Sequence, residues 1–192
     1  MSILVFDLET TGLNSTKNTI VSIAAKLFDS NRNIITSYTT DCFNPDGEIN
    51  LQALLINRFT LSRLSNLKTE KEALFGFCDW LLSLPRTEEI IIAGHNVSFD
   101  LDFIKKRLLS SNIEGFDQVA SYRVIDTAGW GRLLALSGIL PSNTKVSLSG
   151  LVKVLNIPYD ETKHHGASYD VDLTAQVIFS IIDLLRNKNE IL

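Results

Sequence analysis

Residues 3–12 read ILVFDLETTG, and this stretch sets the framework for the whole chain. Strand side chains alternate between two faces, so Asp7 and Glu9 share one face, and the apolar residues divide between both. Apolar side chains on both faces indicate a central strand that is covered on each side. Two carboxylates on one face at the end of such a strand are costly to bury unless they are paired or bound to a metal ion. A strand that has already ended, with both acids in solvent, would explain the same residues.

The rest of the chain predicts an α/β fold. Three strand-like runs come first, and helix and strand signals alternate after them. Three antiparallel strands followed by parallel ones would make a mixed central sheet flanked by helices, as in the RNase H-like fold. We expect residues 1–192 to form a single domain, with strands at 2–8, 19–28, 34–40, 89–93 and 122–126 and helices near 51–57, 69–84, 98–110, 127–137, 147–156 and 168–187. Thr69 and Glu72 predict a capping box, and Ser98 is expected to open its helix.

Composition narrows the class of protein. The net charge of −4 argues against a surface built to grip long nucleic acid, so contact with nucleic acid should be local or helped by a partner. No stretch reaches the roughly 18 apolar residues of a membrane helix. We expect no signal peptide, because a strand-like run begins at the first residues. Cys42 and Cys78 form no C-x-x-C pair and are typical of buried thiols in a reducing compartment, so a cytoplasmic protein is expected.

A second group of acids lies in GHNVSFDLDFIKKR, residues 94–107, where a strand signal ends and a helix begins. Positions two apart on a helix point about 200° apart, so Asp100 and Asp102 cannot share a site. Asp100 lies above apolar residues three and four positions later and should lean toward the core. Asp102 lies above Lys105 and Lys106, which favours a solvated ion pair. Compensation of the helix dipole would also explain Asp100.

The third group lies in KHHGASYDVDLT, residues 163–174. Asp170 falls on an apolar helical stripe, with Leu173, Val177 and Ile181. Asp172 falls on a more polar stripe and should face water. His164 and His165 both precede the helix, and helix geometry does not choose between them.

Four carboxylates that converge without matching cations repel one another, which raises their pKa values. Hard divalent cations such as Mg²⁺ or Mn²⁺ relieve this repulsion, because they prefer oxygen ligands and leave positions for water and phosphate. Two such ions, bridged by a carboxylate, form a two-metal site of the kind that cleaves phosphodiesters by in-line displacement. A histidine could then take the proton of the attacking water.

Three segments resemble the motifs of the DEDDh (DnaQ-like) 3′–5′ exonucleases, the family of the proofreading epsilon subunit of bacterial DNA polymerase III. They are DLETTG from Asp7, GHNVSFD ending at Asp100, and HGASYD from His165 to Asp170. The family's spacing selects His165 together with Asp170. The resemblance implies that Asp7 bridges two Mg²⁺ or Mn²⁺ ions, and that Glu9, Asp100 and Asp170 complete the metal site. It also implies release of 5′-mononucleotides from a 3′ end.

The resemblance further implies substrate contacts. Thr10 and Leu13 would line the terminal sugar and base, and His95 and Phe99 would flank the terminal nucleotide. Asn96 would brace the loop. Leu13 and Phe99 fit a place in the hydrophobic core as well. One segment departs from the family: residues 57–60 read NRFT where relatives often carry His-Gly-Ile-Thr, which puts the contacts made there in doubt.

Three functions stay open at this point. The first is a 3′–5′ exonuclease on single-stranded or frayed DNA, either free-standing or working with a polymerase or accessory protein. The second is an exoribonuclease, since the motifs do not separate ribose from deoxyribose. The third is an inactive module that holds a polymerase or nucleic acid; loss of an acid would favour it, and none is lost. The basic run at 105–107 would serve as a phosphate track or simply as a solvated face.

Overall fold

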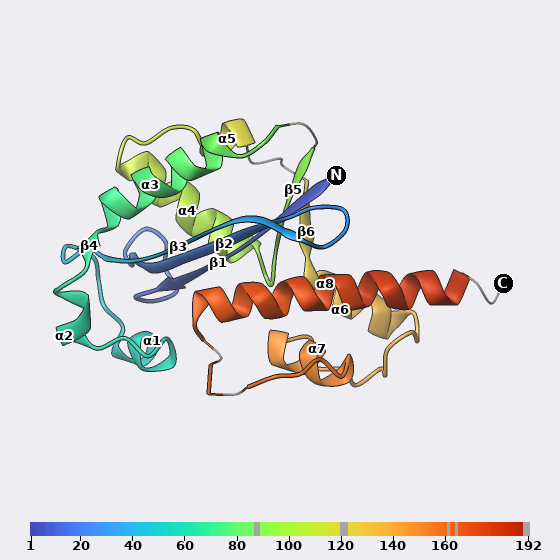
Figure 1. Ribbon diagram of the computed structural model, residues 1–192. Helices are drawn as coiled ribbons and strands as arrows, with labels where there is room; N and C mark the ends of the chain where they lie inside the picture. Colours follow the sequence, from blue (N-terminus) through green and yellow to red (C-terminus); the bar gives the residue numbers. More distant parts are fainter. Residues whose placement is uncertain (87–88, 120–122, 161, 164, 190–192) are drawn as a thin grey trace.

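The computed structural model describes residues 1–86, 89–119, 123–160, 162–163 and 165–189. At its centre lies a mixed sheet of six strands in the order β4-β3-β2-β1-β5-β6 (Figure 1). The strands are β1 (Ser2–Thr10), β2 (Ile20–Phe28), β3 (Ile34–Phe43), β4 (Lys68–Thr69), β5 (Ile90–Gly94) and β6 (Val124–Asp126). Strands β1, β2 and β3 are antiparallel neighbours, and β5 and β6 run parallel to β1. The predicted mixed sheet is therefore confirmed.

Helices cover both faces of this sheet. Helices α3, α4 and α5 lie on one face, and α6, α7 and the long α8 lie on the other (Figure 1). The helices are α1 (Leu51–Ile56), α2 (Leu61–Leu64), α3 (Glu70–Ser83), α4 (Ser98–Ser110), α5 (Phe116–Val119), α6 (Thr127–Leu136), α7 (Leu148–Val154) and α8 (Ala167–Asn189). A search of the described residues finds no helix with the length and apolar character that a membrane crossing requires.

The central strand β1 is buried on both faces, as its sequence predicts. Leu4, Phe6 and Leu8 pack into the core formed with α3 and α4. Val5 packs on the opposite face against Val171 of α8. Both helix layers therefore hold β1 in place, and the acids at its end project from a rigid strand.

The carboxyl end of β1 projects beyond its parallel neighbour. The pairing of β1 with β5 stops at Val5 and Ala93, and β5 ends one residue later. Further along β1, the backbone N–H of Leu8 donates instead to Oδ1 of Asp100, at 3.0 Å. Because a buried backbone N–H needs an acceptor, this bond fixes the first turn of α4 beside the end of β1.

Two details at helix starts test the sequence signals. The capping box of α3 is confirmed: Glu72 N–H donates to Oγ1 of Thr69, and the Glu72 carboxylate accepts from the Thr69 N–H. Helix α4 begins at Ser98, as expected, and its N-cap is Val97, where no side chain makes a capping hydrogen bond.

Candidate active site

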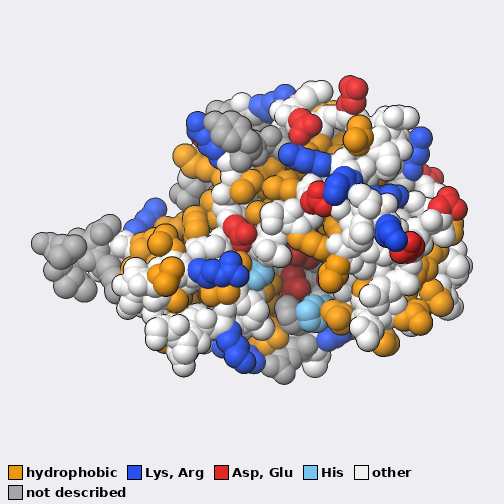
Figure 2. All heavy atoms as spheres, turned by 180° about the vertical axis from the view of Figure 1, so that it is seen from behind, with side chains coloured by type: hydrophobic (Ala, Val, Ile, Leu, Met, Phe, Trp, Pro, Cys, Tyr) orange, Lys and Arg blue, Asp and Glu red, His pale blue; other side chains and the backbone are white. Residues whose placement is uncertain are grey.

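Three of the predicted acids meet at the carboxyl end of β1. Asp7 and Glu9 come from β1 and Asp170 from the first turn of α8, and their carboxylate oxygens lie within 4.8 Å of one another. Glu9 and Asp170 are buried, and Asp7 is half-buried. Figure 2 shows acidic side chains at the bottom of a hollow with histidine side chains near its edge. The structure thus gathers side chains that are far apart in the sequence.

Asp100 lies beside this group without being one of the three. Its side chain is 3% exposed, and the hydrogen bond from Leu8 N–H ties its carboxylate to the same end of β1. Its charge is close enough to raise the pKa of Asp7. All four acids that the family resemblance selects therefore lie at one end of the central strand.

Burial and mutual repulsion shift the titration of these acids. Burial raises the pKa of Asp7 well above its usual value, and the charges of Asp100, Glu9 and Asp170 raise it further. Burial raises the pKa of Glu9 to about 8, with further contributions from Asp170 and Asp100. Burial also raises the pKa of Asp100 to about 8, against the opposing effect of its backbone hydrogen bonds. In the absence of cations the cluster therefore retains protons that ordinary carboxyl groups have lost at neutral pH.

The two neighbouring acids that helix geometry excludes do not join this group, although Asp172 lines a cleft together with Glu9. Asp172 forms an ion pair with Lys26, and its side chain is 39% exposed. Asp102 is exposed and forms an ion pair with Lys106 at 3.0 Å. Each is held by its own lysine at the surface, as the helical phase predicts.

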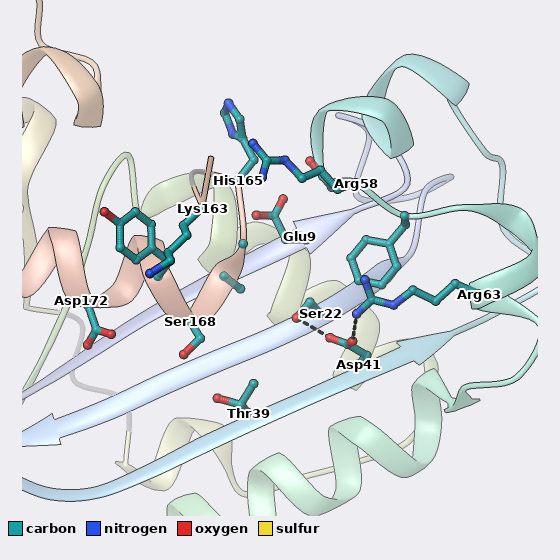
Figure 3. A pocket seen from close by; sticks show the side chains of 15 residues that line it. Glu9, Ser22, Thr39, Asp41, Arg58, Arg63, Lys163, His165, Ser168 and Asp172 are labelled. Atoms are coloured by element: carbon teal, nitrogen blue, oxygen red, sulfur yellow. Dashed lines mark hydrogen bonds and ion pairs between the residues drawn. The ribbon is translucent and has the colours of Figure 1, made fainter. Parts of the chain in front are cut away.

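His165 lies at the amino-terminal end of α8. It is exposed, its φ of +62° is in the left-handed region, and it lines a cleft together with Glu9 (Figure 3). His164 lies outside the described residues. The choice between the two histidines therefore still depends on the motif spacing.

The cleft has a volume of about 470 Å³ and extends from Glu9 along one face of the sheet. Ser22, Thr39 and Asp41 of β2 and β3 line it between two walls, as Figure 3 shows. The start of α8 forms one wall, and the other consists of residues 57–59 with Arg63. Sequence reasoning had singled out the turn at 57–60 only as a departure from the family, and it missed Arg63, Lys163 and Tyr169.

The four predicted substrate residues occupy different environments. Thr10 is buried, and its Oγ1 donates to the carbonyl of Gly12 at 2.6 Å. Leu13 is 85% exposed, so a place for it in the core is wrong. Phe99 is half-buried and its ring centroid lies 4.8 Å from that of Phe103, so it does contact the core.

His95 is half-buried, and its Nδ1 lies 2.8 Å from Oγ1 of Thr127. Like Thr10, Leu13 and Phe99, it does not line the cleft along the sheet. The neighbouring loop is braced by Asp126, whose Oδ1 accepts from the backbone N–H of Asn96 at 2.9 Å and also caps α6. The Asp126 charge contributes to the raised pKa of Asp100. Sequence reasoning missed this acid, although its place at the carboxyl end of a parallel strand is a usable signal.

Glycine at position 12 is required by close packing. A Cβ atom there would lie 2.5 Å from Oδ1 of Asn18, and that oxygen already accepts from the backbone N–H of Asn14 at 2.9 Å. The last residue of DLETTG therefore sets the path of the chain directly after the acids.

Comparisons with known proteins agree with this geometry. DNA polymerase III of the PolC type from Thermotoga maritima is 31% identical over 184 residues, which cover 95% of this chain and 12% of the polymerase. The corresponding polymerase of Streptococcus pyogenes is 28% identical over 189 residues, covering 98% of this chain and 12% of the polymerase. The chain thus spans about one eighth of the length of these relatives.

Among solved structures, Escherichia coli exonuclease I in complex with a dT13 oligonucleotide superposes with a TM-score of 0.76 at 18% identity, covering 94% of this chain and 40% of that one. At this identity the likeness shows a shared fold. The sequence profile of the RNase T family, described as exonuclease, matches residues 4–178. Because this match spans nearly the whole chain and includes all three acidic segments, the chain belongs to the RNase T family of exonucleases, together with the DnaQ-like enzymes that its motifs resemble.

Proposed function

We propose that this chain is a metal-dependent 3′–5′ exonuclease that releases 5′-mononucleotides from single-stranded or frayed DNA ends. The observation that carries the proposal is the meeting of Asp7, Glu9 and Asp170 within 4.8 Å, beside a cleft at the end of the central strand. DNA is the proposed substrate because the relatives are DNA polymerases and the structurally similar exonuclease I binds a dT13 oligonucleotide.

The donor set suits a hard divalent cation. It offers carboxylate oxygen only, and burial has raised the pKa values of three of these acids, so bound cations would relieve an existing repulsion. Asp7, Glu9, Asp100 and Asp170 are the residues that would hold two Mg²⁺ or Mn²⁺ ions. Such ions, when bound, would neutralise phosphate charge and acidify the attacking water.

The remaining steps fall to side chains around the acids. His165 lies at the cleft with Glu9 and is exposed, so its neutral imidazole can take a proton from the attacking water and pass it to solvent. Thr10, Leu13, His95 and Phe99 are the proposed contacts to the terminal nucleotide. The high exposure of Leu13 supports a contact between its side chain and the terminal nucleotide, because an apolar side chain in solvent can pack on a sugar or base.

A partner would fit the charge of the chain. With a net charge of −4, the protein lacks the excess of basic residues that holds long nucleic acid. We propose that a polymerase or an accessory protein presents the 3′ end, and that residues 1–192 act as one exonuclease domain in that setting.

The experiment that tests this function is product analysis on end-labelled oligomers. Single-stranded DNA, double-stranded DNA and single-stranded RNA are incubated with Mg²⁺, Mn²⁺, Ca²⁺ or excess EDTA. We expect stepwise release of 5′-mononucleotides from DNA 3′ ends with Mg²⁺ or Mn²⁺, poor turnover with Ca²⁺ because of its looser coordination, and none with EDTA. Full activity in EDTA would contradict the metal mechanism, and a preference for RNA would favour the exoribonuclease.

Asp7→Ala provides the matched inactive protein. It should abolish release in every metal while the protein stays folded, because the substitution removes a proposed metal ligand and one of several repelling charges. Circular dichroism and a thermal melt check the fold. Wild-type rates in this variant, or loss of activity that merely follows unfolding, would count against the assignment.

A further inference from the structure

Four helices of the described chain end in the same backbone motif. At the ends of α1, α4, α6 and α7 one residue adopts a left-handed φ: Arg58 (+58°), Asn112 (+53°), Gly138 (+72°) and Asn156 (+54°). In each case the N–H of the next residue donates to the carbonyl five positions earlier, at distances of 2.9 to 3.0 Å. This is the Schellman arrangement, in which glycine is the usual left-handed residue.

Arginine is the exception among these four residues. Glycine and asparagine enter the left-handed region readily, whereas a longer side chain is strained there. The chain uses glycine or asparagine at three of the four sites and arginine at the end of α1. Strained residues that persist tend to cluster at functional sites, where the strain has a use.

The backbone of the turn does not require an arginine. Its neighbours hold the turn in place: Asn57 Nδ2 donates to the carbonyl of Thr10 at 2.9 Å, and Phe59 is 7% exposed and packs with Leu54. The two motif hydrogen bonds are made by backbone atoms, from Arg58 N–H to Leu55 O and from Phe59 N–H to Leu54 O. A glycine at position 58 would keep every one of these contacts.

The direction of the side chain supplies a reason for it. Residue 58 is exposed and lies in the wall of the cleft, and Figure 3 shows the Arg58 guanidinium reaching over Glu9 toward His165. Arg63 and Lys163 line the same cleft and add further positive charge there.

We propose that Arg58 binds a phosphate of the substrate strand in this cleft. The inference rests on the proposed exonuclease function and extends it to a residue where the family turn has glycine. A guanidinium can bond two phosphate oxygens at once, and it keeps its charge at any working pH. The chain has a net charge of −4, and its cleft begins at an acidic cluster, so both repel a nucleic-acid strand. The positive charge of Arg58 in the cleft would attract the phosphates of that strand locally.

Arg58→Gly tests the proposal with two measurements, the melting temperature and kcat/KM. Relief of strain should raise the melting temperature, whereas loss of a phosphate contact should lower kcat/KM. We expect the melting temperature to rise by a few degrees as strain is relieved. We also expect kcat/KM on a single-stranded DNA oligomer to fall at least about tenfold, with the slope of log KM against log salt reduced by about one. Arg58→Lys should recover part of kcat/KM, since it restores charge without the two-pronged geometry.

Asn112 offers the matched control, because it holds the same motif position at the end of α4 and does not line the cleft. Asn112→Gly should leave kcat/KM unchanged. Asn112→Arg should lower the melting temperature by a few degrees with unchanged kcat/KM, which measures the cost of arginine in this conformation directly.

Oligomers that carry one methylphosphonate at a time locate the contact. Wild-type protein should lose affinity when one particular phosphate is neutralised, and Arg58→Gly should be insensitive at that position. An Arg58→Gly protein with wild-type kcat/KM and salt slope would overturn the inference while leaving the exonuclease function intact. If the wild type releases no nucleotide with any metal, the proposed function fails by itself. Equal oligomer affinity of wild type and Arg58→Gly in fluorescence anisotropy would then overturn the Arg58 contact.

Discussion

Helix phase decides which acids can enter the site. Asp100 and Asp102 are two positions apart on α4, and Asp170 and Asp172 are two apart on α8. In each pair the first acid is buried, at 3% and 6% exposed, and the second forms an ion pair at the surface. Each helical residue turns by about 100°, so a step of two moves a side chain to the far side of the helix.

This asymmetry gives a paired prediction. Asp170→Asn should abolish nucleotide release, because the amide removes a charged metal ligand. Asp172→Asn should stay within a few-fold of wild type, since its partner is Lys26 and not the acidic cluster. The measurement is single-turnover release of mononucleotide from a short DNA oligomer. Equal losses in the two variants would mean that α8 presents a different face to the site.

His165→Ala should lose roughly 10²–10⁴-fold in the same assay, the range that removal of a general base usually costs. Metal affinity should change little, because the proposed ligands are all carboxylates. His164→Ala should stay within a few-fold of wild type. If His164→Ala proves to be the inactive variant and His165→Ala near normal, the motif register must shift by one residue.

Much of the site was predictable from single residues, and part of it was not. Asp7, Glu9, Asp100 and Asp170 follow from strand alternation and helix phase together with the motif resemblance. Arg58 could not be found in this way, because its significance depends on a backbone conformation and on the cleft that it borders. Neither feature leaves a periodic signal in the sequence.

At the scale of secondary structure, length separates the predicted elements from the missed ones, with the exception of the three-residue strand β6, which was predicted. The long strands and helices carry several repeats of their hydrophobic period and were found within a few residues of their ends. Helices α2 and α5 have four residues each and β4 has two, which is too short for any period. Strand β4 forms because Lys68 and Thr69 pair with the end of β3. The local sequence does not predict this tertiary contact.

The basic run at 105–107 shows how tertiary structure overrides a local reading. Arg107 is neither a phosphate track nor a solvated residue: its Nε donates to Oε1 of Glu70 at 2.9 Å. Glu70 is the first residue of α3, is 2% exposed, and also accepts from the backbone N–H of Ile20 at 2.9 Å. One buried carboxylate therefore joins α3, α4 and β2.

Breaking this ion pair should be costly. Arg107→Met leaves the Glu70 carboxylate buried without its cation, so we expect the free energy of unfolding to fall by about 3–5 kcal/mol. Lys105→Met, an exposed neighbour in the same basic run, should change it by less than about 0.5 kcal/mol. Urea unfolding of both variants measures the difference. Similar values would show that the buried pair adds nothing beyond the loss of a surface charge.

At the scale of the whole molecule, the acidic cluster destabilises the folded state in the absence of cations. Its members come from β1, α4 and α8, so the carboxylates approach one another only when the chain is folded. The pKa values of Glu9 and Asp100 rise to about 8 in the metal-free fold. Between the ordinary carboxyl range near pH 4 and about pH 8, the folded protein therefore binds more protons than the unfolded chain. The contribution of the cluster to the free energy of unfolding therefore falls as the pH rises through that window.

Metal ions should reverse this trend, and the reversal is the last prediction. In EDTA the melting temperature of the wild type should decline from pH 5 to pH 8. With excess Mg²⁺ the decline should vanish or invert, because the ion binds only the folded cluster. It also competes with protons for the carboxylates, so it binds more tightly at higher pH. Asp7→Ala should show a shallower decline in EDTA and little gain from Mg²⁺, whereas Asp172→Asn should follow the wild type in both. A wild-type melting temperature that rises with pH in EDTA would mean that the acids are stabilised by groups of the protein itself, and the metal assignment would lose its physical basis.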